Sequence, residues 1–275
     1  MSLKKIKQVL KEKPTYYIPI ALLVLLCLSV LLAPLIPIDP NQSDVLNMNQ
    51  PPSLKHIFGT DQIGRDYFIR VLYGGQISLL VGILAMLTSI IIGTSVGLIS
   101  GYFGGVIDNI LMRFIDVLSS IPWLVLVIVL SVYMKPGLKT IIIIIGCFSW
   151  MGIARLIRAE TLSLKEREYV TYARFIKLPA FKIIIRHILP GVLPILIVTA
   201  TGSIAGAIMT ESTLSFLGLG IQPPYASWGS LLQNGQTILA TAPHMALIPG
   251  VFIMLTIFSF NKIGDLFQEM IGGGN

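Results

Sequence analysis

Five long stretches of this sequence carry no Asp, Glu, Lys or Arg, and they leave very few possible architectures. They span residues 14–38, 71–107, 117–134, 188–210 and 212–261. A helix of about 20 apolar residues crosses a bilayer, whereas a membrane β-strand alternates apolar and polar residues over about ten positions. These stretches do not alternate in that way. The sequence therefore predicts an all-α, polytopic membrane protein.

The low charge content supports the same fold class. Only 12% of the 275 residues are charged, against about 25% in ordinary soluble domains. The first stretch is long and lacks a small-x-small cleavage pattern, so we interpret it as a retained span rather than a signal peptide. We predict six transmembrane helices, near residues 17–36, 78–100, 109–134, 138–157, 191–216 and 243–261.

The distribution of basic residues predicts the orientation. Residues 1–13 hold five lysines (Lys4, Lys5, Lys7, Lys11 and Lys13), and residues 155–186 hold eight Lys or Arg, together 13 of the 20 basic residues. We expect Arg155 and Arg158 to reach the membrane interface at the end of the fourth span. The positive-inside bias places both regions, and with six spans both termini, in the cytoplasm. The net charge of +7 then reports orientation and not nucleic-acid binding.

Three parts follow from this arrangement. Residues 1–75 would form a cytoplasmic tail, the first transmembrane helix and an extracellular segment. Residues 76–264 would form the main transmembrane domain, and residues 265–275 a cytoplasmic C-terminal tail.

No motif in the chain predicts catalysis or cofactor binding. Residues 59–66 have the glycine spacing of a phosphate-binding loop, but Arg65 and Asp66 stand where that loop needs Lys and Ser or Thr. The three histidines and two cysteines are scattered and suggest no metal site. We therefore expect a non-catalytic chain without a metal or nucleotide of its own.

Ionisable residues inside predicted spans are the next candidates, because such groups are costly in a membrane and often functional. Arg113 and Asp116, three residues apart, are predicted to form a structural pair on one helix face. Glu211 is more isolated, and Ser212 and Ser215 follow it. This group could line a translocation pathway or gate, or it could make packed hydrogen bonds to the following loop. The sequence leaves both interpretations open.

Small residues recur at helical spacing in two spans. Gly93, Gly97 and Gly101 form two consecutive G-x-x-x-G units, and Gly202 and Gly206 form another. Such faces let helix backbones approach closely in a membrane. The contact could lie within the chain or with a second subunit.

The charged segment between the fourth and fifth spans is unusual in so apolar a chain. We predict two short helices, residues 164–175 and 181–189, around Leu178 and Pro179. Tyr169, Ala173 and Ile176 fall on one side of the first helix. Two short helices around a turn could also describe a DNA-reading unit, but this one joins membrane spans at both ends and is apolar at residues 183–185. A cytoplasmic docking element for another protein fits better.

This segment resembles the cytoplasmic loop, often called the EAA loop, of permease subunits of ATP-binding cassette importers. Further stretches resemble the dipeptide, oligopeptide and nickel branch of that family, in particular the subunit of the permease pair with the short amino terminus. They read FGTDQIGRDYFIRVLYGGQISL (58–79), GYFGGVIDNILMRFIDVLSSIP (101–122), ESTLSFLGLGIQPPYASWG (211–229) and FNKIGD (260–265). The resemblance covers nearly the whole chain.

The resemblance implies a five-helix type I importer core behind an extra first helix. It also implies that the chain lies in the cell membrane with four partner subunits: a second permease, two cytoplasmic ATPases that carry ATP and Mg²⁺, and an extracellular substrate-binding protein. The chain itself would hold no cofactor and would contact only protein and lipid, not nucleic acid. A coupling loop at about residues 158–190 would transmit ATPase closure, and the cargo would be peptides, nickel or metal chelates.

The loop departs from the family pattern E-A-A-x-x-x-G. The corresponding residues run from Thr171 to Lys177, so Tyr172 replaces the first Ala and Lys177 replaces the Gly. If the turn needs a positive φ there, Lys costs roughly 1–2 kcal/mol more than Gly; alternatively, the following Leu-Pro pair forms the turn. We expect Tyr172 to act as a knob, and Arg174 and Lys177 to supply charge. The full expected coupling set is Tyr169, Tyr172, Ala173, Arg174, Lys177, Leu178 and Pro179.

Two other classes of membrane protein compete with this interpretation. An ion-coupled secondary transporter or a channel subunit would need carboxylates near the midplane or an inverted repeat, and the sequence shows neither. A purely structural membrane scaffold is the second alternative.

Overall fold

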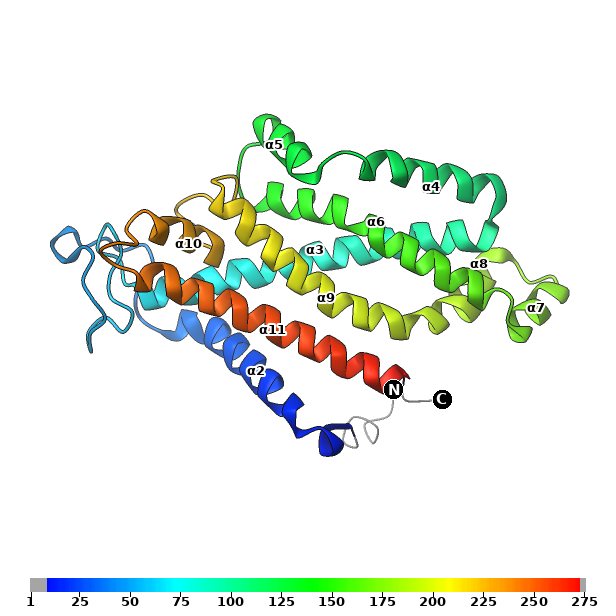
Figure 1. Ribbon diagram of the computed structural model, residues 1–275, viewed down its shortest axis with the longest axis horizontal. Helices are drawn as coiled ribbons and strands as arrows, with labels where there is room; N and C mark the ends of the chain where they lie inside the picture. Colours follow the sequence, from blue (N-terminus) through cyan, green and yellow to red (C-terminus); the bar gives the residue numbers. More distant parts are fainter. Residues whose placement is uncertain (1–8, 273–275) are drawn as a thin grey trace.

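The computed structural model describes residues 9–272 and is built from α-helices that run roughly side by side (Figure 1). Lys4, Lys5 and Lys7 of the predicted cytoplasmic tail lie outside the described residues. The long helices are α2 (Tyr17–Leu32), α3 (Tyr67–Phe103), α4 (Gly105–Ser119), α5 (Trp123–Tyr133), α6 (Leu138–Leu164), α9 (Leu189–Phe216) and α11 (His244–Gly272). The short ones are α7 (Glu168–Phe175), α8 (Ala180–Ile183), the π-helical turn η4 (Ile184–Ile188) and α10 (Trp228–Gln236).

Five helical segments in the described part of the chain are long and apolar enough to cross a membrane. They are Pro14–Leu35, Tyr67–Phe103, Leu138–Leu164, Ala180–Phe216 and His244–Ile271. A sixth crossing exists only if the bent pair α4–α5 counts as one span. The all-α, polytopic prediction is confirmed, and the number of spans is five or six.

The predicted third span, residues 109–134, is not one continuous helix. Its two halves, Gly105–Ser119 and Trp123–Leu130, meet at 78°. Pro122 has no N–H to donate, and its ring disfavours helical angles at the preceding Ile121. The chain therefore leaves the helix after Ser119 and starts α5 directly after Pro122. The proline was visible in the sequence, and the prediction of an unbroken span was wrong.

Several helices extend beyond the predicted spans. α3 begins at Tyr67 and has 37 residues, roughly 55 Å at about 1.5 Å per residue, which exceeds the apolar thickness of a bilayer. α11 continues to Gly272. The divisions that the sequence suggested after residues 75 and 264 therefore fall inside α3 and α11.

The glycine stripe of α3 packs against α6 within the chain. A Cβ on Gly97 would lie 2.7 Å from the Ala154 carbonyl oxygen, and one on Gly101 would lie 2.9 Å from that of Arg158. The absence of side chains lets the two backbones touch along these turns. Gly202 and Gly206 of α9, in contrast, have open space within 4 Å where a Cβ would stand.

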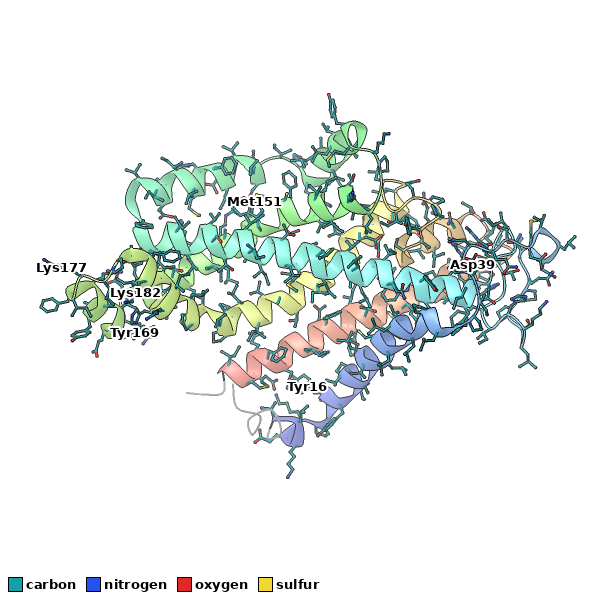
Figure 2. All side chains as sticks on the ribbon, turned by 180° about the vertical axis from the view of Figure 1, so that it is seen from behind. Tyr16, Asp39, Met151, Tyr169, Lys177 and Lys182 are labelled. Atoms are coloured by element: carbon teal, nitrogen blue, oxygen red, sulfur yellow. The ribbon has the colours of Figure 1, made fainter. Side chains whose placement is uncertain are left out.

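The bundle has two distinct ends (Figure 1). The α7–α8 hairpin forms one, which we call the hairpin end. Helix α10 and the irregular segment 36–66 form the other, the α10 end. In Figure 2, Tyr169, Lys177 and Lys182 lie opposite Asp39 along the long axis. An ion pair between Lys13 Nζ and Glu269 Oε1, 2.6 Å apart, joins the segment just before α2 to the end of α11.

Apolar side chains cover much of the outside between these ends. On α2, Leu25 and Leu31 are 66% and 69% exposed. Water would disfavour such a surface, but lipid tails are as apolar as leucine. The long helices are therefore suited to a bilayer.

Candidate functional site

Helix α7 of the hairpin ends in a Schellman motif. Leu178 N–H donates to the Ala173 carbonyl at 3.1 Å, and Lys177 N–H donates to the Arg174 carbonyl at 2.9 Å. In this motif the residue directly after the C-cap, here Lys177, adopts a left-handed backbone conformation. Lys177 adopts φ = +57°. The positive φ therefore stays at the position of the family's glycine, and the turn does not move to Leu178 and Pro179.

Pro179 then starts the second helix of the hairpin. It is the N-cap of α8, with φ = −62° and ψ = 141°. Its fixed φ suits the residue that leads into a helix. Leu178 links the two helices and packs, half-buried, against the apolar core beneath them.

The base of the hairpin is an apolar core. Val170 and Ala173 are 0% and 2% exposed, and they pack with Ile183 of α8 and with Ile184 and Ile188 of η4. The same core includes residues of α3, α6 and α9. Ala173, expected among the coupling residues, thus faces into the protein and gives the hairpin a rigid connection to three long helices.

The tip of the hairpin exposes large apolar groups. Tyr172, Phe175 and Phe181 are 65%, 82% and 77% exposed, and Tyr169 and Ile176 are about half exposed. We call these five residues the apolar tip. Sequence reasoning missed Phe175 and Phe181, although the signal was present. Two large aromatic residues in a segment rich in Lys and Arg are a sequence signal for an exposed apolar patch.

Arg174 is partly engaged by its own chain. Its guanidinium carbon lies 5.4 Å from the centroid of the Tyr102 ring, in a cation–π contact. Lys165 Nζ donates to the Gly101 carbonyl at 3.1 Å. Both contacts tie the hairpin region to the end of α3. Arg174 and Lys177 are nevertheless exposed.

The charged residues near the α4 helix pair differently from the prediction. Asp116 Oδ1 accepts from Arg155 Nη2 at 3.0 Å, so the predicted pair of Arg113 with Asp116 is wrong. A pair on one helix gains only about 0.2–0.5 kcal/mol, and the neighbouring α6 brings a competing arginine within reach.

Arg158 forms a second unforeseen pair across these helices. Its Nε and Nη2 donate to the two Asp108 oxygens at 2.5 and 2.6 Å, and Ser100 Oγ also donates to this carboxylate. This two-point geometry is the strong form of an Arg–carboxylate pair. Arg155 and Arg158, which we expected to reach the membrane interface, thus each pair with a carboxylate of α4.

Glu211 lies in a buried polar cluster at the α10 end. Its carboxylate is 0% exposed and accepts from Ser215 Oγ at 2.6 Å and from Ser78 Oγ at 3.2 Å. Ser78 Oγ in turn accepts the N–H of Trp228, the first residue of α10, at 3.1 Å. The carboxylate thus joins α3, α9 and α10 through hydroxyl groups.

The three predicted pathway residues therefore have different surroundings. Glu211 and Ser215 are fully enclosed in this cluster, which matches the alternative of a packed hydrogen bond. Ser212 is 5% exposed, its Oγ has no partner among the described residues, and it lines an apolar cavity of about 620 Å³ between α9, α10 and α11.

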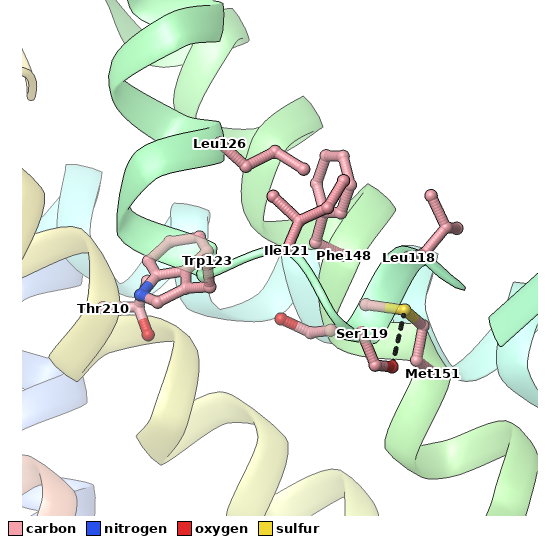
Figure 3. Close-up of a pocket in the computed structure, with 9 residues that line it drawn as sticks. Leu118, Ser119, Ile121, Trp123, Leu126, Phe148, Met151 and Thr210 are labelled. Atoms are coloured by element: carbon pink, nitrogen blue, oxygen red, sulfur yellow. Dashed lines mark hydrogen bonds between the residues drawn. The ribbon is translucent and has the colours of Figure 1, made fainter. Parts of the chain in front are cut away.

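A second cavity lies at the bend between α4 and α5 (Figure 3). It has a volume of about 390 Å³ and combines aromatic and hydroxyl groups. Trp123 and Phe148 form apolar walls, while Thr210 approaches from α9. Ser119 Oγ donates to Met151 Sδ at 3.4 Å on its far side. The bend that the sequence prediction missed thus creates a concave surface.

The irregular segment at the α10 end contains a carboxylate outside the spans. Asp44 accepts from Asn47 Nδ2 at 2.7 Å and from the Leu46 N–H at 3.2 Å. These hydrogen bonds stabilise the ionised form and lower the pKa of Asp44 from its ordinary value. Across residues 9–272, no three His, Cys, Asp or Glu side chains gather in a way that could hold a metal ion.

Comparison with curated proteins reveals clear relatives. The chain is 44% identical over 231 residues to the dipeptide transport system permease protein DppC of Bacillus subtilis, covering 84% of this chain and 72% of the relative. It is 43% identical to the oligopeptide permease OppC of Haemophilus influenzae, covering 86% and 76%. The glutathione permease GsiD of Pectobacterium atrosepticum is 39% identical, with 86% and 79% covered.

Solved structures support the fold. An inward-facing structure of the MetNI methionine ABC transporter aligns with a TM-score of 0.60, at 17% identity, over 74% of this chain and 97% of that one. Residues 93–273 match the family described as "Binding-protein-dependent transport system inner membrane component". With its long apolar helices, the chain is a multi-pass inner-membrane protein. It belongs to the family of binding-protein-dependent transport system inner membrane components, the permease subunits of ATP-binding cassette importers.

Proposed function

We propose that this chain forms half of the translocation pathway of a peptide importer, and that the hairpin couples it to a cytoplasmic ATPase. The observation that carries the proposal is the apolar tip on a rigid base. Phe175 and Phe181 are more than three-quarters exposed, while Val170 directly beneath them is fully buried. An exposed aromatic cluster on a charged loop is typical of a protein-docking surface.

The tip can supply real binding energy. Burying apolar surface contributes about 25 cal/mol per Å², and a large aromatic side chain buries about 150–250 Å². Tyr172, Phe175 and Phe181 would therefore contribute several kcal/mol if a groove of the ATPase covers them. Arg174 and Lys177 stand at the edge of the tip and would select a groove with acidic groups.

The apolar core at the base of the hairpin would transmit a displacement of the tip to the spanning helices. Val170 and Ile183 pack in one core with Ile157 of α6, Leu98 of α3 and Val192 of α9. Packed interiors transmit displacement because they resist compression. Movement of the ATPase would therefore shift three spanning helices together.

Peptides are the proposed cargo because the relatives described above are permeases for dipeptides, oligopeptides and glutathione. Nickel and metal chelates, also expected from the family resemblance, have no counterpart among these relatives. We place the wall of the pathway at the α4–α5 cavity, where Trp123, Ser119 and Thr210 offer both apolar and hydrogen-bonding surface. Glu211 and Ser215 we assign to holding α10 in position.

The proposed assembly has a second permease, two ATPases and an external binding protein. The hairpin end faces the cytoplasm together with both termini, and the α10 end faces the binding protein. ATP and Mg²⁺ would bind to the ATPases. The open surface at Gly202 and Gly206 supports a close helix contact with the second permease, because no group within residues 9–272 lies within 4 Å of where a Cβ would stand.

The decisive experiment uses the complete transporter in proteoliposomes with its binding protein and a peptide. Phe175→Ser and Arg174→Glu should leave the membrane complex assembled but reduce peptide-stimulated ATP hydrolysis and uptake. Glu166→Ser is the matched control, because Glu166 is exposed on the same segment but lies outside the apolar tip. Undiminished transport by Arg174→Glu would remove Arg174 from the coupling set. Failure of any ATPase to co-purify with the unaltered chain would contradict the proposal itself.

A further inference from the structure

A cavity of about 260 Å³ at the α10 end contains a buried arginine. Arg70, in the second turn of α3, is the one charged side chain among the described lining residues. Its side chain is only 4% exposed. The other polar side chains of the wall are Asn41, Tyr73, Gln76 and Tyr225.

The hydrogen bonds of Arg70 leave part of its guanidinium unused. Nη1 donates to the Pro40 carbonyl at 3.0 Å and to Asn41 Oδ1 at 3.2 Å. Nε is buried and has no hydrogen-bond partner among the described residues. Both side-chain hydrogen bonds of Arg70 to the described residues come from Nη1, and Nη2 forms none. A guanidinium carries five N–H donors, so three remain available.

The nearby carboxylate does not satisfy these donors. Asp61 Oδ2 lies 3.6 Å from Arg70 Nε, which is too long for a hydrogen bond. The same oxygen accepts from Arg65 Nε at 2.6 Å, and Asp61 Oδ1 accepts the N–H groups of Ile63 and Arg65 at 3.0 Å each. One carboxylate thus serves two guanidinium groups, and its close contact goes to Arg65.

The next carboxylate along the chain is also engaged elsewhere. Asp66 Oδ2 lies 2.9 Å from His56 Nδ1, and Asp66 Oδ1 accepts the Ile69 N–H at 3.1 Å. Neither Asp66 nor His56 lines the cavity. Arg70 therefore faces the cavity with positive charge that no lining residue balances.

We propose that this cavity binds a carboxylate group, with Arg70 Nη2 as its charged donor and the hydroxyls of Tyr73 and Tyr225 beside it. An arginine that is buried without full pairing is unfavourable, and a bound anion removes that penalty. A guanidinium matches a carboxylate in shape and charge. A single lining cation suits a monoanion better than a phosphate or sulfate, which calls for several positive groups.

The volume also fits this ligand class. A water molecule occupies about 30 Å³ of the liquid, so the cavity has room for a carboxylate with a short chain attached. Two sources share this chemistry: a free small carboxylic acid and the C-terminal carboxylate of a short peptide. The site does not depend on the coupling role of the hairpin, and it can be tested without transport.

The test is calorimetric titration of the complete transporter in lipid nanodiscs, without binding protein or ATP. The probes are sodium acetate, alanylalanine and alanylalanine amide, at constant ionic strength with sodium chloride. We expect acetate and alanylalanine to bind and the amide not to bind. Binding by acetate alone identifies a free carboxylate, and binding by alanylalanine alone identifies a peptide terminus. If neither binds, or the amide binds as well as the free peptide, the proposal is overturned.

Two variants distinguish binding in the cavity from nonspecific electrostatic attraction to the protein. Arg70→Lys keeps the charge but loses the planar fork, and we expect it to weaken binding at least about tenfold. Arg65→Lys is the matched control, because Arg65 contacts the same Asp61 but does not line the cavity. Equal weakening by both variants would overturn the proposal.

A third variant avoids the buried network altogether. Tyr225 is 65% exposed, so Tyr225→Trp should fold normally while narrowing the cavity. We expect it to weaken acetate binding several-fold. If Arg70→Lys fails to assemble, this variant decides: unchanged binding in Tyr225→Trp contradicts the proposed site.

Discussion

The turn after α7 and the turn after α9 share one pattern of backbone hydrogen bonds but place different residues in the left-handed position. After α9, Leu219 N–H donates to the Leu214 carbonyl at 2.9 Å, and Gly218 has φ = +81°. After α7, the same position holds Lys177 with φ = +57°. Glycine adopts this conformation without strain, whereas lysine pays roughly 1–2 kcal/mol. The hairpin therefore tolerates a strained turn that the α10 end avoids.

The surroundings of the two turns explain the difference. The α9 turn leads into the buried cluster of Glu211, Ser78 and Trp228, where each polar group needs its partner. The α7 turn is exposed above an apolar core, and the exposed Lys177 is not part of that core. One end is held by directional hydrogen bonds, and the other by apolar burial that leaves its tip free to dock.

The largest expected effect tests the hydrogen-bonded end. Glu211→Ala should lower the free energy of unfolding by about 4 kcal/mol, because it leaves a cavity and removes the acceptor of two buried hydroxyls. Thermal unfolding of the purified protein in detergent measures the loss. Glu211→Gln keeps the shape and one acceptor, and should lose far less. Equal losses in the two variants would show that the carboxylate charge, not the packing, holds α10.

Substitutions of two glycines compare how tightly the two ends are packed, and the expected loss of stability is of intermediate size. A Cβ on Gly229 of α10 would lie 2.5 Å from the Ser212 Cα, which is backbone and cannot yield. Gly229→Ala should therefore destabilise the protein by about 2 kcal/mol. Gly191, at the hairpin side of α9, would meet only the flexible Leu164 side chain, at 2.9 Å.

Gly191→Ala serves as the matched variant, and we expect its unfolding temperature to stay near that of the unaltered protein. The gain in helix propensity should offset the small rearrangement of Leu164. A loss as large as that of Gly229→Ala would mean that the hairpin end is packed as rigidly as the α10 end.

The smallest expected effects concern the two left-handed residues and should have opposite signs. Lys177→Gly should stabilise the protein by up to about 1 kcal/mol, because it relieves the strained φ. Gly218→Ala should destabilise it by about 1 kcal/mol for the converse reason. Denaturation of both variants under one condition checks the signs. Destabilisation by Lys177→Gly would show that the lysine side chain makes a contact worth more than the strain.

The sequence allowed the membrane class, most helix positions and the hairpin to be predicted. Uncharged runs of sufficient length specify spanning helices almost independently of tertiary context. The Leu178–Pro179 pair specified the division of the hairpin, because proline disfavours a helix through the preceding residue. The bend at Pro122 followed the same rule and should have been predicted.

The pairing of charged groups could not be predicted in the same way. Asp108 and Arg158 are 50 residues apart, and only the packing of α4 beside α6 brings them together. Arg113 and Asp116 were predicted as partners because sequence spacing was the only available measure of distance. The choice between pathway and packing for Glu211 likewise depended on which helices enclose it.

The sequence by itself therefore determined that the chain spans a membrane, where most of its helices lie, and that a charged hairpin interrupts them. These properties depend on local chemistry, in which transfer free energy and backbone sterics act residue by residue. Only the tertiary structure decided that Ala173 is buried while Phe175 is exposed. It also decided that Arg70 lines a cavity while some of its N–H donors have no hydrogen-bond partner among the described residues. Those outcomes depend on contacts between distant segments, which no single stretch of sequence contains.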